Sequence, residues 1–249
     1  KGRRRQHDPR QIDFLALLEG AIDIPNPQPE PAPSEGTCAF DLDLRRLLNE
    51  NLVLCVRGQK LAPPAFRDAM ARFGTPMKRL QLAATAECDE VNIISSEDRD
   101  VLGDGKKLVN GASWHTDDSF MREPCTLTML YGVVVPPTGG DTQFVNMYAA
   151  YDALSAPMKA FLSGLTAIHD GGPNYTRTNR IIGEEGPKSF PRAEHPVIRT
   201  HPVTGRQAIF VNPVFTTAIK SLPDAESKAI LEFLYEHCGR PHWQVRFTW

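Results

Sequence analysis

The chain contains 249 residues, of which 41% are hydrophobic and 23% are charged. The 28 basic and 30 acidic residues nearly cancel and give a formal net charge of -2, so no overall field favours nucleic acid or an anionic membrane. No apolar run approaches the roughly 20 residues that a membrane-spanning helix needs. The composition therefore predicts a soluble, cytoplasmic protein with one main folded domain and with neither nucleic-acid nor membrane partners.

The amino-terminal part differs in composition from the rest. The basic run Lys1–Arg5 is typical of a solvated tail, although a nuclear address or a phosphate-binding arm uses the same residue types. Residues 12–18 could form a short amphipathic helix. Proline at every second position over 25–33 favours polyproline II, as a stiff linker or as a ligand for a proline-binding module. We predict a leader or linker over residues 1–36 and a folded domain over 37–249.

The predicted elements of the domain mix helices with short strands. Helices are expected over the leucines at 42–48, from Pro63 to Phe73, and from Leu222 to Cys238, where Gly239 marks the end. Strands are expected in β-rich or alternating runs at 52–56, 91–94, 125–135, 165–169, 207–211 and 243–249. The irregular spacing argues against a propeller or a doubly wound sheet and favours a mainly β sandwich or jelly roll with flanking helices.

The strongest chemical signal is the segment Trp114-His115-Thr116-Asp117-Asp118. In an extended strand, residues two apart project to the same side, so His115 and Asp117 would present a nitrogen and a carboxylate oxygen to one point. Trp114 and Thr116 would face the other way. A His and a carboxylate with one further His form the facial triad of non-haem Fe(II) oxygenases. Taken alone, such a pair is more often a surface hydrogen bond than an iron site.

Further motifs follow in a fixed order and make the interpretation more specific. They are Gly139-Gly140-Asp141-Thr142, Asn146-Met147-Tyr148-Ala149-Ala150-Tyr151, His195-Pro196-Val197 and Arg199-Thr200-His201-Pro202. With the W-H-x-D segment, they resemble the taurine dioxygenase and 2,4-dichlorophenoxyacetate dioxygenase (TauD/TfdA) family of Fe(II)- and 2-oxoglutarate-dependent dioxygenases. The resemblance covers roughly residues 50–249 and implies a double-stranded β-helix, the cupin-like jelly roll, without its last strands.

The resemblance also implies the roles of particular residues. His115 and Asp117 would be catalytic iron ligands, and the Thr142 hydroxyl would help to hold 2-oxoglutarate, with O2 as second co-substrate. Without the resemblance, Thr142 reads as a turn residue. The third iron ligand, a His, and the 2-oxoglutarate arginine are expected beyond Trp249, so the domain is expected to be incomplete there. The other candidates for the third ligand are expected to be structural: His169, His195, His201 and His242.

The implied reaction hydroxylates a small organic substrate, often an anion in this family, while 2-oxoglutarate is decarboxylated to succinate and CO2. The alternative is a truncated, catalytically inactive family member that acts as a binding or interaction module. Two loops, 98–111 and 170–194, are candidate walls of the substrate pocket. Arg177 and Arg180 in the second loop could bind an anion, but neighbouring glutamates balance their charge. A homo-oligomer is compatible with the sequence.

Overall fold

A computed structural model of the chain describes residues 14–17, 39–79, 84–95, 111–176 and 189–249. Its residues form two compact units, one of Lys1–Pro76, Leu127–Asn146 and Gln244–Trp249, the other of Met77–Thr126 and Met147–Trp243. Residues 1–13 and 18–38, which hold the basic run and the proline-rich run, lie outside the described residues. The boundary between leader and domain therefore stays a prediction.

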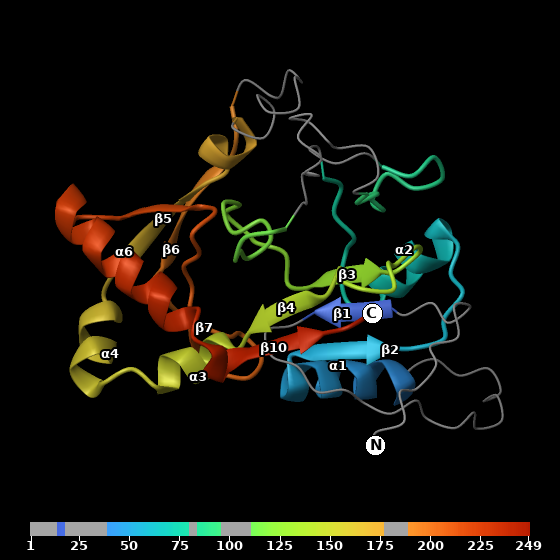
Figure 1. Cartoon of the computed structure of the whole chain (residues 1–249), viewed down its shortest axis with the longest axis horizontal. Coiled ribbons are helices and arrows are strands. Elements are labelled where there is room, and N and C mark those ends of the chain that lie inside the picture. Colours follow the sequence, from blue (N-terminus) through green and yellow to red (C-terminus); the bar gives the residue numbers. More distant parts are fainter. Residues whose placement is uncertain (1–13, 18–38, 80–83, 96–110, 177–188) are drawn as a thin grey trace. The chain divides into compact units, whose positions relative to one another are not determined.

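The described residues of the first unit form two small antiparallel sheets and two helices (Figure 1). One sheet has the strand order β2-β1-β3, and the other pairs β10 with β4. The elements of this unit are β1 (Phe14–Leu17), α1 (Ala39–Asn51), β2 (Val53–Val56), α2 (Pro63–Ala71), β3 (Thr128–Tyr131), β4 (Thr142–Val145) and β10 (Gln244–Phe247).

Strand β1 corrects the expected helix over residues 12–18. Phe14–Leu17 lies between β2 and β3 and pairs antiparallel with both. Its backbone can therefore hydrogen-bond on both edges of the strand, which a short isolated helix could not match in stability. A short apolar run does not by itself distinguish helix from strand.

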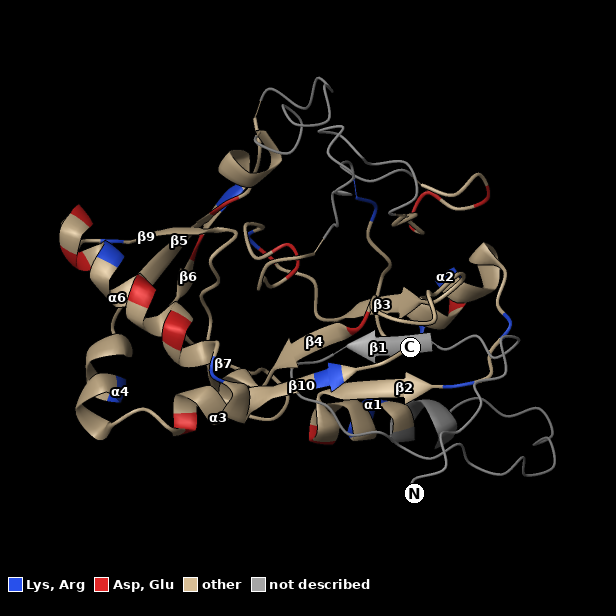
Figure 2. Cartoon of the chain, in the orientation of Figure 1, with Lys and Arg blue, Asp and Glu red and all other residues tan. Residues whose placement is uncertain are grey.

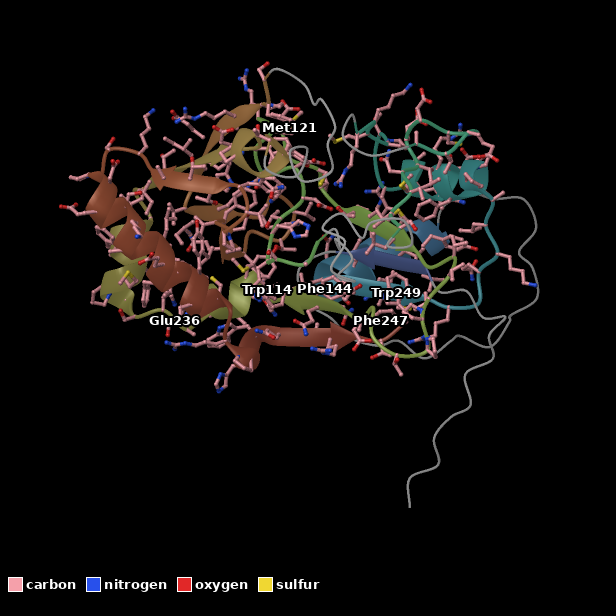
Figure 3. The ribbon with its side chains drawn as sticks, turned by 45° about the horizontal axis from the view of Figure 1, so that its top comes forward. Trp114, Met121, Phe144, Glu236, Phe247 and Trp249 are labelled. Carbon is pink, nitrogen blue, oxygen red and sulfur yellow. The ribbon has the colours of Figure 1, made fainter. Side chains whose placement is uncertain are left out.

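The helices and strands of the first unit follow the expected signals more closely. α1 directs Leu47 and Leu48 inward, and Leu48 is buried. α2 begins at Pro63 as expected, because a proline in the first turn loses no helical hydrogen bond. Val53 and Cys55 of β2 form a core with partly buried side chains from the other strands and the chain end (Figure 3): Leu130, Phe144, Phe247 and Trp249.

The second unit also holds two small antiparallel sheets, with strand orders β6-β5-β9 and β7-β8. Its elements are α3 (Met147–Asp152), α4 (Ala156–Leu162), β5 (Thr166–Asp170), β6 (Arg192–Pro196), β7 (Ile198–Thr200), β8 (Gln207–Ile209), β9 (Thr216–Ile219), α6 (Asp224–Cys238) and η1 (Pro241–Trp243). No closed barrel is formed by the strands that are described in either unit.

Helix α6 ends at Cys238 as predicted and begins at Asp224, two residues after the expected start at Leu222. Acidic residues occupy its first turn, where they favour the positive end of the helix dipole, and Gly239 caps its carboxyl end. Leu231 and Leu234 are buried beside β9, and each contributes roughly 1.5–3 kcal/mol through burial. Charges of both signs lie on the outer side of α6 (Figure 2).

One face of the β6-β5-β9 sheet carries alternating small and polar side chains. In the β5–β6 register, His169 pairs with Ala193, and Ala167 pairs with His195. All four side chains therefore lie on the same face of the sheet. That face is buried: Ala167 and His169 have no exposed surface, and Ala193 and His195 are at most 9% exposed. This buried face therefore presents two imidazoles and two small alanine side chains to the residues that pack on it.

Two predicted strands are wrong or too long. Residues 91–94 form no strand; Asn92 makes only an isolated bridge to Ala84. The run 125–135 is a strand only over Thr128–Tyr131, and Val133 and Val134 beyond it are 72% and 83% exposed. The described helices include none that is long and apolar enough to cross a membrane.

Candidate functional site

The W-H-x-D segment is a loop that leads into a turn, and the expected extended strand is wrong here. Residues 114–116 have no regular structure, and residues 117–120 form a turn. Asp118 takes a φ of 53°, in the left-handed region that few non-glycine residues adopt. Backbone hydrogen bonds from Ser119 to Thr116 and from Met121 to Asp118 close the turn. We call residues 115–121 the ligand loop.

The loop nevertheless brings together the two side chains that were predicted to meet. His115 Nε2 lies 3.3 Å from Asp117 Oδ1, and both side chains are partly exposed. His115 Nδ1 lies 2.8 Å from the Ser113 carbonyl oxygen. Because a carbonyl only accepts, Nδ1 carries the hydrogen, and Nε2 of the neutral ring turns its lone pair to Asp117. Two acceptors at this distance require a proton or a metal cation between them.

The geometry of this pair fits a divalent metal. Two ligands about 2.1 Å from one ion, at right angles, lie about 3 Å apart. The 3.3 Å between His115 Nε2 and Asp117 Oδ1 is close to that spacing. A backbone carbonyl on the other ring nitrogen is the usual partner of a metal-binding histidine. The residues present therefore fit Fe(II), although the described residues contain no group of three or more His, Cys, Asp or Glu that could hold an ion.

Arg79 binds the carboxylates of the ligand loop and was not singled out from the sequence. Its guanidinium lies 3.1 Å from Asp117 Oδ2 and 3.0 Å from Asp118 Oδ2. Asp117 thus faces His115 with one oxygen and Arg79 with the other, which fixes the plane of its carboxylate. No local pattern marks Arg79, because it lies far upstream of the loop that it contacts.

The shifted pKa values of the site have physical causes in these contacts. Burial lowers the pKa of Arg79, but Asp117 and Asp118 outweigh it and raise the pKa overall. The hydrogen bond that the protonated ring donates to Asp117 raises the pKa of His115 against the effect of burial. Burial raises the pKa of Asp118, with Arg79 acting in the opposite direction. The site is therefore a group of charged side chains in which Arg79 supplies the positive charge beside Asp117 and Asp118.

Aromatic rings lie beside His115 in the second unit. Phe215 meets the His115 ring edge-on, with centroids 6.5 Å apart, and Phe120 packs against Phe215 at 4.8 Å. Tyr175 contacts both phenylalanines and stacks on Phe190. Burial, followed by the charge of Asp118, raises the pKa of Tyr175 to about 12. Phe215 therefore links His115 to a cluster of aromatic rings.

Thr142, the predicted 2-oxoglutarate residue, lies in the first unit as the first residue of β4. It pairs in register with Phe247 of β10. Trp249 Nε1 donates a hydrogen bond of 2.9 Å to Thr142 Oγ1. A hydroxyl that accepts one hydrogen bond still has its own hydrogen to donate, as the binding of a carboxylate requires.

The other histidines have structural surroundings. His169 and His195 are buried on one face of the β6-β5-β9 sheet, and His195 lies in β6, an edge strand of that sheet. His201 Nδ1 accepts from the backbone of Val203 and Thr204, and His242 lies in η1 against Trp243. The candidate loops lie mainly outside the described residues, which exclude 96–110 and 177–188.

His115 and Asp117 place an imidazole and a carboxylate side by side, on a scaffold of short antiparallel strands. The family described as "Taurine catabolism dioxygenase TauD, TfdA family" matches residues 29–249. The chain belongs to this family.

Individual relatives agree with this membership. The "Alpha-ketoglutarate-dependent 2,4-dichlorophenoxyacetate dioxygenase" of Cupriavidus pinatubonensis is 31% identical over 224 residues, 83% of this chain and 76% of the relative. A Schizosaccharomyces pombe relative, whose name refers to an alpha-ketoglutarate-dependent sulfonate dioxygenase, is 42% identical over 137 residues, 55% of this chain and 35% of the relative. The chain thus spans about a third of the length of that relative.

A solved structure is similar as well. The crystal structure of a taurine dioxygenase from Burkholderia xenovorans has a TM-score of 0.66 and 28% identity, and the match covers 94% of this chain and 75% of that one. The family comprises 2-oxoglutarate-dependent dioxygenases, enzymes that use Fe(II), 2-oxoglutarate and O2. The comparisons do not support the alternative of an inactive binding module.

Proposed function

We propose that this protein hydroxylates a small organic substrate while 2-oxoglutarate is decarboxylated to succinate and CO2. One observation carries the proposal: His115 Nε2 and Asp117 Oδ1 lie 3.3 Å apart as the ligands of one ion would. In this proposal His115 and Asp117 are two of the iron ligands and Thr142 binds 2-oxoglutarate. The third ligand that the resemblance predicts is a histidine beyond Trp249.

Bound Fe(II), together with 2-oxoglutarate and O2, supplies the oxidising chemistry of the reaction. The residues of the chain position the reactants. The Ser113 carbonyl fixes the His115 tautomer, and Arg79 orients the Asp117 carboxylate. The Thr142 hydroxyl, held by the Trp249 indole, donates to a carboxylate oxygen of 2-oxoglutarate. Phe215 packs edge-on against His115 and makes that side of the ring apolar.

The substrate class and the jelly-roll topology also belong to this proposal. Relatives are named for a phenoxyacetate and for sulfonates, which are small organic anions. We infer a substrate of that kind. The likeness to the taurine dioxygenase structure supports a jelly-roll arrangement of the short antiparallel strands.

The test is a survey of substrates with the purified full-length protein. Succinate release is measured with Fe(II), 2-oxoglutarate and O2 in the presence of alkyl sulfonates, aryl sulfonates and aryloxyacetates, and each reaction is repeated with a chelator. We expect at least one anion to raise chelator-sensitive succinate release. Succinate release that is unaffected by the chelator would contradict the proposal.

Substitution of Thr142 should chiefly raise the requirement for 2-oxoglutarate. In Thr142→Ala we expect the KM for 2-oxoglutarate to rise about 10-fold, equivalent to about 1.4 kcal/mol, because a donor to a charged group is lost. Thr142→Ser keeps the hydroxyl and should stay near the wild type. Thr217→Ala removes a comparable strand hydroxyl, which donates to the Ile168 carbonyl, and serves as the control. An unchanged KM in Thr142→Ala would remove this residue from the site.

A further inference from the structure

The residues that follow Asp117 are held by side chains of the β6-β5-β9 sheet and of the loop before β9. Ser119 Oγ accepts a hydrogen bond of 3.0 Å from Asn212 Nδ2 and lies 3.1 Å from His169 Nδ1. Two residues on, His195 Nε2 donates to the Met121 carbonyl at 2.9 Å. These are long-range contacts, made by elements that lie far from the ligand loop in sequence. We call Ser119, His169, His195 and Asn212 the anchor residues.

All four anchor residues are buried. Ser119 and His169 have no exposed surface, Asn212 is 4% exposed and His195 is 6% exposed. A buried polar group that loses its partner costs about 1–3 kcal/mol. The ligand loop therefore cannot move away from His169, His195 and Asn212 without leaving several polar groups unsatisfied.

The anchor residues are themselves fixed in orientation. Asn212 Oδ1 accepts from the backbone of Val214 and Phe215, so its amide nitrogen must face Ser119. Thr216 Oγ1 accepts from the Asn212 backbone and lies 3.4 Å from His169 Nδ1. These contacts together fix the side-chain orientations of Asn212 and Thr216.

Ring packing restrains the two imidazoles further. Phe210 stacks on His169 at 5.4 Å and meets His195 edge-on at 5.3 Å. The two imidazoles contact each other edge-on at 5.3 Å. Ala193 is paired with His169, and Ala167 is paired with His195. The small side chains of these alanines leave space for the ligand loop to approach the sheet.

We propose that the anchor residues position His115 and Asp117 for metal binding. This inference rests on the proposed function, because it concerns the same ligands. Ser119 lies two residues after Asp117. Within the turn, Ser119 N donates to Thr116 O and Met121 N donates to Asp118 O. A shift of Ser119 or Met121 would therefore also move His115 and Asp117. Outer partners of metal ligands typically contribute 10–100-fold in metal affinity.

The test compares two matched serine variants of the full-length protein. Ser119→Ala removes an anchor contact. Ser227→Ala is the control, because Ser227 is 4% exposed and accepts a comparable buried hydrogen bond from the Ile219 backbone at 2.8 Å, away from the ligand loop. Affinity for Co(II) alone is measured from its visible absorption, and folding from circular dichroism and thermal melting.

We expect Ser119→Ala to bind Co(II) about 10-fold more weakly, with an altered absorption band, while Ser227→Ala keeps the wild-type affinity and band. Both variants should melt at lower temperatures, since each loses a buried hydrogen bond. Wild-type affinity in folded Ser119→Ala, or equal losses in both variants, would overturn the positioning role alone. A wild-type protein that does not bind Co(II) would overturn the metal site of the proposed function as well.

A second pair of variants tests the same inference at another anchor residue. His195→Leu removes the donor to the Met121 carbonyl, whereas the amide of His195→Gln can replace the Nε2 donor. We expect weaker Co(II) binding in His195→Leu and recovery toward the wild type in His195→Gln. Equal affinity in folded His195→Leu and wild type would contradict a positioning role for His195.

Discussion

Replacing His115 or Asp117 by alanine should abolish Fe(II)-dependent succinate production. Each variant removes one of the two proposed ligand atoms, which lie 3.3 Å apart, so the loss should exceed the roughly 10–100-fold that an outer partner contributes. Asp117→Ala also leaves Arg79 with only Asp118 as its carboxylate partner in the ligand loop. The measurement is the initial rate of succinate release at saturating 2-oxoglutarate, with metal content determined on the same samples.

His242→Ala is the control for this experiment, because it makes the same substitution at an exposed histidine of η1. Its rate and metal content should match the wild type. Turnover in His115→Ala at the wild-type rate would refute the iron-site assignment. A low rate with full metal content would place His115 in catalysis but outside the ligand set.

The parts of the fold that were predictable are those with local signals. The bounds of α6 follow from Pro223, the acidic first turn and Gly239, all of which act within the helix itself. β5 follows from its own alternation, in which Ala167 and His169 point inward. Neither element needed information from a distant part of the chain.

Pairing partners decided the elements that were missed. The apolar run at 91–94 has strand composition, but Ile93 and Ile94 are 54% and 56% exposed, and among the described residues the run makes only the isolated bridge from Asn92 to Ala84. Phe14–Leu17 is a strand because β2 and β3 flank it. The composition of a segment indicates how well it suits a strand, but the strand forms only if a partner strand pairs with it, and that partner can lie far away in the sequence.

The site shows the same division. The contact between His115 and Asp117 was predictable because the two residues are two positions apart, and it survives although the segment is a loop and turn. Arg79 and Asn212 reach the ligand loop from distant positions that no spacing rule connects. The alternation of Ala and His in β5 and β6 was a readable signal of a buried polar face.

Removing the positive charge at Arg79 should lower the stability of the protein by about 2 kcal/mol. The Asp118 side chain is only 9% exposed, and in Arg79→Met it would either stay charged next to Asp117 without the balancing cation or have to take up a proton, and both cost stability. Breaking a fully buried pair from one side costs about 3–5 kcal/mol, and the 25% exposure of the Arg79 side chain lowers the expected value. The free energy of unfolding is measured by urea denaturation in the absence of metal.

Lys78→Met is a matched control at the neighbouring position. Lys78 makes a 2.6 Å ion pair with Asp89, but both side chains are more than half exposed, so solvent already screens the pair and its loss should hardly change the urea midpoint. The double variant Arg79→Met/Asp118→Asn should recover part of the stability lost in Arg79→Met, because the buried carboxylate is then neutral. If Arg79→Met and Lys78→Met unfolded at the same urea concentration, the partly buried ion pairs of Arg79 would contribute no more to stability than the exposed pair of Lys78. The role of Arg79 would then be limited to orienting Asp117.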